Sequence, residues 1–310
     1  MVLTLLSSAI LYAPGAFFFF PWKPVMQALG GDSYEVGYKH FRRDHSDPTN
    51  LCLHIVALAW QLLGNFGLLS TLDAQHVGDT IRGLSPALGH MGRPLSTVTA
   101  VLWVLTLVTS PAPPVCTATS AACIAVAYFV APLLSPRELE MGMMGAFVAT
   151  LILASVVFAP RVKTKEPRSL VKDLAHAFKM FGLAAAFRLA ATPWAGAWAA
   201  SHATADTALV VIMAVLAMLP KPTVPTVLGG MLCARALGEL SSNNALLFYG
   251  QAFVAQLSQG VAHDVSRQKA TLLTHEDSSE GRGVKLAFEW SHVTYFPNLL
   301  MHSCYASLRK

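Results

Sequence analysis

Residues 45–70 read H-S-D-P-T-N-L-C-L-H-I-V-A-L-A-W-Q-L-L-G-N-F-G-L-L-S, a polar cluster that runs directly into an apolar stretch. Asp47 followed by Pro48 is typical of a helix start, because the aspartate can cap the first backbone N–H groups and proline is well tolerated at the first helical position. The apolar run 51–70 reaches the length of about 20 residues that a membrane span needs. We therefore predict a membrane helix that begins at about residue 48.

Two histidines of this cluster are candidate metal ligands. Asn50 and His54 are four residues apart and share one face of the predicted helix. His45 precedes the helix start, so the break at Pro48 lets its side chain fold back toward His54. Imidazole binds iron, zinc, copper or nickel well. On spacing alone, a metal site and a pair of hydrogen-bonded structural histidines both remain open.

A second pair of the same spacing lies near the other end of the chain. Gln259 and His263 are four residues apart, at the end of the apolar run 244–262. Asn298 and His302 repeat the N-x-x-x-H spacing, which chance also explains. We take His302 as a fourth candidate ligand beside His45, His54 and His263.

Composition indicates an integral membrane protein. Of 310 residues, 54% are hydrophobic and 13% are charged, whereas soluble domains carry about 25% charged residues. We predict an all-α, polytopic transmembrane helical bundle of six to eight spans, some of them short or broken. The apolar stretches are 51–70, 97–110, 115–134, 142–159, 182–200, 205–219, 224–238, 244–262 and 286–306.

The positive charge of the chain fits a membrane better than nucleic acid. The net charge is +5, but the basic residues are scattered beside apolar segments, as in Arg42 and Arg43 before the first strong span. We therefore expect a membrane as partner and no nucleic acid. The chain also lacks a glycine-rich nucleotide-binding motif.

Four regions follow from these patterns. Residues 1–33 are predicted to form an apolar anchor or imperfect span, and 34–160 the N-terminal helical half. A basic linker, 161–181, precedes the C-terminal helical half, 182–310. Within that half the polar interval 267–285 reads as an exposed loop.

The motif H-x-x-P-x-N-x-x-x-H at 45–54, preceded by Tyr38, and the motif Q-x-x-x-H at 259–263 resemble the Mpo1-like family, formerly a domain of unknown function. Its members are small multi-pass proteins of the endoplasmic reticulum. The founding member is an iron(II)-dependent dioxygenase that shortens 2-hydroxy fatty acids by one carbon during sphingoid-base breakdown. The match covers about 34–70 and 246–275.

The resemblance implies a function and a site. His45, His54 and His263 would be ligands of Fe²⁺ or their neighbours, and Asn50 and Gln259 would orient an imidazole or a substrate carboxylate. The implied partner is a fatty acyl substrate, and the implied location is the membrane of the endoplasmic reticulum.

Departures from the family pattern favour an alternative, a non-enzymatic membrane scaffold or assembly subunit that kept the fold. They occur at Ala57, Ala59, Arg267 and Thr271. Arg267 could instead pair with a substrate carboxylate or lie at the membrane interface. A histidine-box di-iron hydroxylase is disfavoured because the chain lacks an H-x-x-H-H box, and a transporter because no charge lies clearly in mid-span.

Overall fold

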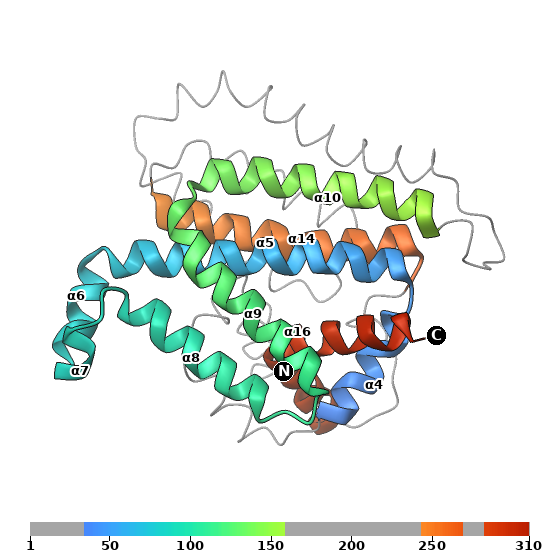
Figure 1. Ribbon diagram of the computed structural model, residues 1–310, viewed down its shortest axis with the longest axis horizontal. Helices are drawn as coiled ribbons and strands as arrows, with labels where there is room; N and C mark the ends of the chain where they lie inside the picture. Colours follow the sequence, from blue (N-terminus) through green and yellow to red (C-terminus); the bar gives the residue numbers. More distant parts are fainter. Residues whose placement is uncertain (1–33, 159–242, 269–281, 310) are drawn as a thin grey trace.

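The computed structural model describes residues 34–158, 243–268 and 282–309. Within these ranges the chain is almost entirely helical and has no strand (Figure 1), so the all-α prediction is confirmed there. The predicted anchor 1–33, the linker 161–181 and the apolar stretches between 182 and 238 lie outside the described residues.

The helices are packed as a bundle of long elements with two short helices at one end (Figure 1). In chain order they are α4 (Tyr34–Asp44), α5 (Pro48–Asp73), α6 (His76–Gly83), α7 (Pro86–Gly89), α8 (Pro94–Val108), α9 (Pro114–Val130) with the 3-10 turn η1 (Ala131–Leu133), α10 (Pro136–Phe158), α14 (Asn244–Ser266) and α16 (Arg282–Leu308).

Three of the described helices are long and apolar enough to cross a membrane: α5, α9 with η1, and α10. α8 is apolar but has only 15 residues, about 22 Å of helix, which is short for a span. The chain runs back and forth through α5, α8, α9 and α10, so α5 begins and α10 ends at the same end of the bundle (Figure 1).

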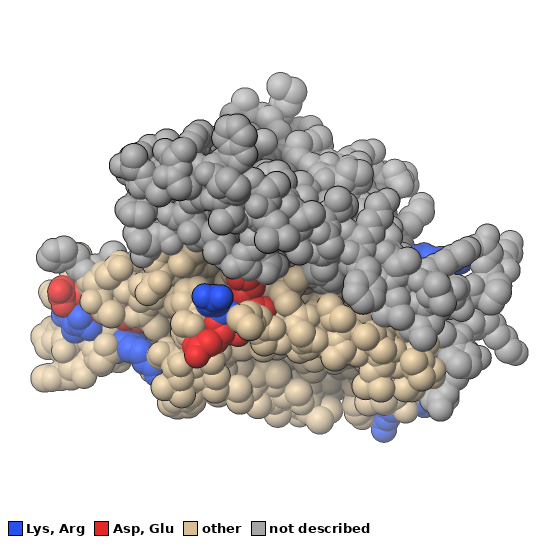
Figure 2. Space-filling model, turned by 90° about the horizontal axis from the view of Figure 1, so that it is seen from above, with Lys and Arg blue, Asp and Glu red and all other residues tan. Residues whose placement is uncertain are grey.

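α5 is the central helix. In its most apolar window 78% of the residues are buried, against 28% for α9 with η1 and 22% for α10. The outer helices instead expose large apolar side chains, as expected of a surface that faces lipid, and most of the described surface in Figure 2 carries no charged residue. The exposed apolar residues include Val101, Leu105, Val126, Phe129, Leu153 and Val156.

α14 packs antiparallel against α5, and small residues let the two backbones approach closely. A Cβ added at Gly64 of α5 would lie 2.9 Å from the backbone nitrogen of Ala252 in α14. One added at Gly67 would run into the ring of Phe248. Such small residues are typical of tightly packed membrane helices. This contact fixes which residues of α5 and α14 face each other.

α16 ties the ends of other helices together. The Asn298 side-chain amide donates to the Leu107 carbonyl at 3.1 Å near the end of α8 and lies 3.2 Å from the Thr117 hydroxyl of α9. On its other side, Arg42 of α4 donates to the Ser303 carbonyl at 3.0 Å. The helix begins at Arg282, so residues 282–285 of the predicted loop are helical.

We predict that Gly64→Ala loosens the contact between α5 and α14. The new methyl group must push against backbone, so the free energy of unfolding should fall by about 1–3 kcal/mol. Gly145→Ala on α10 is the control, because nothing lies within 4 Å of its Cβ position; it should be neutral or stabilising. Unfolding in mixed micelles with increasing denaturing detergent measures both, and equal stabilities would contradict the packing described.

Candidate metal centre

The break before α5 is built as the sequence predicts. The Asp47 carboxylate accepts hydrogen bonds from the N–H groups of Thr49 at 2.8 Å and Asn50 at 3.2 Å, and Pro48 is the first helical residue. The predicted helix start at residue 48 is therefore confirmed. The chain turns here between α4 and α5, which lets the side chain of His45 fold back over the end of α5.

Three histidines meet at this turn. The Nε2 atoms of His45 and His54 are 3.2 Å apart, and the ring of His263 on α14 lies 4.5 Å from the His45 ring and 5.0 Å from the His54 ring, between centroids. One nitrogen from each ring lies within 4.8 Å of the other two. All three side chains are buried, with exposed fractions of 1%, 1% and 6%.

Hydrogen bonds to the backbone determine where two of these rings carry their protons. His45 Nδ1 lies 2.8 Å from the Phe41 carbonyl oxygen, and His54 Nδ1 lies 2.9 Å from the Asn50 carbonyl oxygen. A carbonyl oxygen can only accept, so each Nδ1 carries a hydrogen. Each neutral ring then presents a lone pair at Nε2, and the two lone pairs face each other. Such a pair needs a cation or a shared proton between the rings.

A transition-metal ion fits the spacing of His45 and His54. Histidines that bind metals usually donate the other ring N–H to a carbonyl or carboxylate, as His45 and His54 do. Two nitrogens held at about 2.1 Å from one ion at tetrahedral or octahedral angles lie about 3.0–3.4 Å apart. The observed 3.2 Å falls in that interval. Three imidazoles suit iron, zinc, copper or nickel.

Aromatic side chains hold the rings in place. The Phe41 ring stacks on His45 with centroids 3.7 Å apart and planes within 1° of parallel. Phe296 of α16 meets Phe41 edge-on at 5.8 Å and lies 6.4 Å from the His54 ring. The stacking on Phe41 limits the rotation of the His45 ring, and the backbone carbonyl at Asn50 holds the ring of His54.

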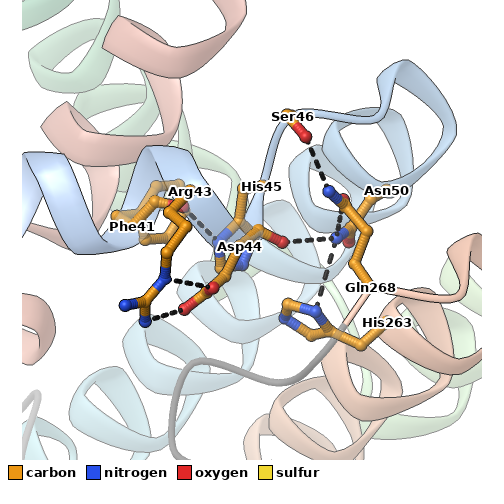
Figure 3. Close-up of polar contacts among 8 residues, drawn as sticks. All are labelled: Phe41, Arg43, Asp44, His45, Ser46, Asn50, His263 and Gln268. Atoms are coloured by element: carbon orange, nitrogen blue, oxygen red, sulfur yellow. Dashed lines mark hydrogen bonds and ion pairs between the residues drawn. The ribbon is translucent and has the colours of Figure 1, made fainter. Parts of the chain in front are cut away.

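Asn50 of α5 connects His263 to the end of α4 (Figure 3). Its Nδ2 atom lies 3.4 Å from His263 Nδ1, 2.8 Å from the Gln268 side-chain oxygen and 3.3 Å from the Asp44 carbonyl oxygen. Its Oδ1 atom is buried without a hydrogen-bond partner. The structure thus brings Asn50 to an imidazole, and its role in orienting that imidazole stays a prediction.

Two of the candidate site residues are not brought into the centre. Gln259 donates to the Gln61 side-chain oxygen at 3.2 Å, farther along the contact between α5 and α14. The ring of His302 stacks on Tyr38 at 3.7 Å, and its Nδ1 lies 3.3 Å from the Tyr34 hydroxyl. α16 turns this histidine toward the tyrosines of α4, and among the described residues the group that could hold a metal ion consists of the other three histidines.

Gln268 is a functional candidate that the sequence motifs miss. Arg267 ends α14 in the left-handed conformation, with φ of 57°, and the Gln268 N–H then donates to the His263 carbonyl at 3.1 Å. This turn sends the Gln268 side chain back over the centre (Figure 3). Gln268 follows the apolar run and belongs to no spacing pattern. The sequence feature that could have identified Gln268 is its position directly after the helix that contains His263.

Comparison with known proteins adds no relative: no protein-family model, no curated protein and no solved structure matches the chain. Inferences about function therefore rest on the three histidines, their hydrogen bonds and the sequence motifs.

We predict that the backbone conformation of Arg267 limits which residues are tolerated at this position, since its φ is positive. Arg267→Val should lower the free energy of unfolding by about 1–2 kcal/mol, because a β-branched residue is strained in the left-handed region. Arg267→Gly should fold at least as stably as Arg267→Ala. Thermal unfolding in detergent measures the series; a Val variant as stable as the Gly variant would contradict the turn.

Proposed function

We propose that His45, His54 and His263 bind a divalent transition metal, and that with iron(II) the protein is a dioxygenase that shortens 2-hydroxy fatty acids by one carbon. The observation that supports the metal is the distance of 3.2 Å between the Nε2 atoms of His45 and His54. In each ring a backbone carbonyl at Nδ1 leaves the lone pair on Nε2. The motifs at 45–54 and 259–263 suggest the reaction through their resemblance to the dioxygenase family.

The ligand set favours an anionic substrate. Three neutral imidazoles add no negative charge, so a divalent centre keeps a net positive charge that attracts a carboxylate. Bound iron(II) would supply binding and activation of dioxygen. The reaction balances in electrons without an external reductant, because dioxygen takes four electrons from the 2-hydroxy acid. The bond between C1 and C2 breaks, and the products are the shorter acid, carbon dioxide and water.

The location of the centre suits a fatty acid. His54 lies in the second turn of α5, so the centre sits close to one end of a candidate span. Beside it, α5, α10 and α14 bury an apolar cluster that includes Leu53, Phe147 and Val261. A carboxylate at the centre would therefore place its acyl chain against apolar helices. We further propose a bundle of six to eight spans in the endoplasmic reticulum membrane, on the apolar stretches and the family resemblance.

A specific observation favours the second candidate, a non-enzymatic membrane scaffold. The three histidines are nearly inaccessible to solvent, and closed metal sites are typical of structural metals rather than catalytic ones. In this role the metal would join the turn between α4 and α5 to the end of α14, and no substrate would reach it.

The two candidates make different predictions for purified full-length protein loaded with iron(II) without oxygen and then given 2-hydroxypalmitate and air. The dioxygenase should hold about one iron per chain and release a product one carbon shorter. His54→Ala should lose both iron and turnover, because it removes a ligand. His90→Ala, which changes an exposed histidine, and His302→Ala should keep the iron.

Iron without turnover in the parent would support the scaffold. Absence of bound iron, zinc, copper and nickel in the parent would contradict both candidates. Retention of iron by His54→Ala would contradict the assignment of this residue as a ligand.

A further inference from the structure

A chain of side-chain hydrogen bonds reaches His263 from the surface (Figure 3). The Gln268 Nε2 atom donates to the Ser46 hydroxyl at 2.8 Å. The Gln268 Oε1 atom accepts from Asn50 Nδ2 at 2.8 Å and from the Asp47 N–H at 3.2 Å. Asn50 Nδ2 lies 3.4 Å from His263 Nδ1. The end of α14 is thereby joined to the turn between α4 and α5 by amide groups.

The Nδ1 contact of His263 differs in kind from those of the other two histidines. The Nδ1 atoms of His45 and His54 face backbone carbonyls, whose direction and acceptor character are fixed. His263 Nδ1 faces the side-chain amide of Asn50, which can present either its nitrogen or its oxygen after a half-turn. The proton of His263 therefore depends on which end of this amide is turned toward the ring.

The two orientations have opposite consequences. With the Asn50 nitrogen toward the ring, Nδ1 accepts, so Nε2 of the neutral ring carries the hydrogen and cannot bind a metal. With Oδ1 toward the ring, Nδ1 donates and Nε2 presents its lone pair. The second orientation gives a partner to Oδ1, which otherwise has none, and moves Nδ2 into the position that Oδ1 leaves. It gives up the contacts to the Asp44 carbonyl and the Asp47 N–H, a cost that metal binding can offset.

We infer that Gln268 is a positioning residue that lets Asn50 turn its oxygen toward His263, which puts the proton on Nδ1 and leaves the Nε2 lone pair for a metal; this rests on the metal centre proposed above. A glutamine suits the role because its amide both donates and accepts, so it can follow Asn50 through either orientation. When Asn50 Oδ1 faces His263, Gln268 Nε2 donates to Oδ1 and Gln268 Oε1 accepts from the Ser46 hydroxyl.

Two substitutions of equal charge test the inference, because each adds one negative charge near the centre. Gln268→Glu can only accept, so it holds the Asn50 nitrogen toward itself and disfavours the orientation that binds metal. Asn50→Asp can only accept from His263 Nδ1, so it favours that orientation, as carboxylate partners of metal-bound histidines do. Simple attraction between the added charge and the cation would tighten both variants.

The experiment measures the affinity of full-length protein in detergent for cobalt(II), by competition with a chelator, while thermal unfolding checks that each variant is folded. Gln268→Glu and Gln268→Leu should bind about 10- to 100-fold more weakly than the parent, and Asn50→Asp should bind at least as tightly. Gln75→Glu, which changes an exposed glutamine at the start of α6, is the control and should leave the affinity unchanged.

Each outcome decides one of the two proposals. A Gln268→Glu variant that binds as tightly as the parent overturns the positioning role while the metal centre stands, and so does an Asn50→Asp variant that folds but binds more weakly. A parent chain that does not bind cobalt overturns the metal centre itself, and with it this inference. Should Asn50→Asp not fold, the two Gln268 variants decide alone.

Discussion

The close antiparallel contact between α5 and α14 is the constraint on which the rest of the structure depends. At Gly64 the backbone of α5 approaches Ala252 so closely that even a methyl group would meet the backbone of α14. Because helices are rigid, this contact also sets the register several turns away, where His54 and His263 face each other. The turn at Pro48 then adds His45 from the preceding helix. The centre thus joins segments from both halves of the chain.

Burial of the three histidines favours a bound cation between His45 and His54. In water, two imidazole lone pairs at 3.2 Å would be separated by solvent, but these rings are within the core, and His45 is stacked on Phe41. Two lone pairs brought this close in a buried site repel each other, and the backbone carbonyls already hold the other ring nitrogens as donors. A shared proton would place a positive charge in the core. A metal ion uses the same lone pairs and suits the spacing.

The sequence was sufficient for those features that depend on neighbouring residues. The helix start at Pro48 follows from capping chemistry, and the return of His45 toward His54 follows from the break at that start. His263 was grouped with His45 and His54 because its motif has the same spacing as theirs. Such spacing does not predict the distance between residues of different helices. Gln259 shares the face of His263, but one helical turn carries it to Gln61. His302 has the same local spacing as His54, yet the packing of α16 on α4 turns it toward Tyr38. The position of the Gln268 side chain depends on a left-handed turn at Arg267. An arginine in the sequence does not predict that conformation.

The most direct test of the central claim, that three histidines hold one metal ion, is X-ray absorption spectroscopy at the metal edge of the full-length protein loaded with cobalt or iron. The account predicts three nitrogen neighbours at about 2.1 Å, with the outer-shell scattering that is characteristic of imidazole rings. A spectrum with oxygen neighbours alone, unchanged in the His54→Ala variant, would contradict it.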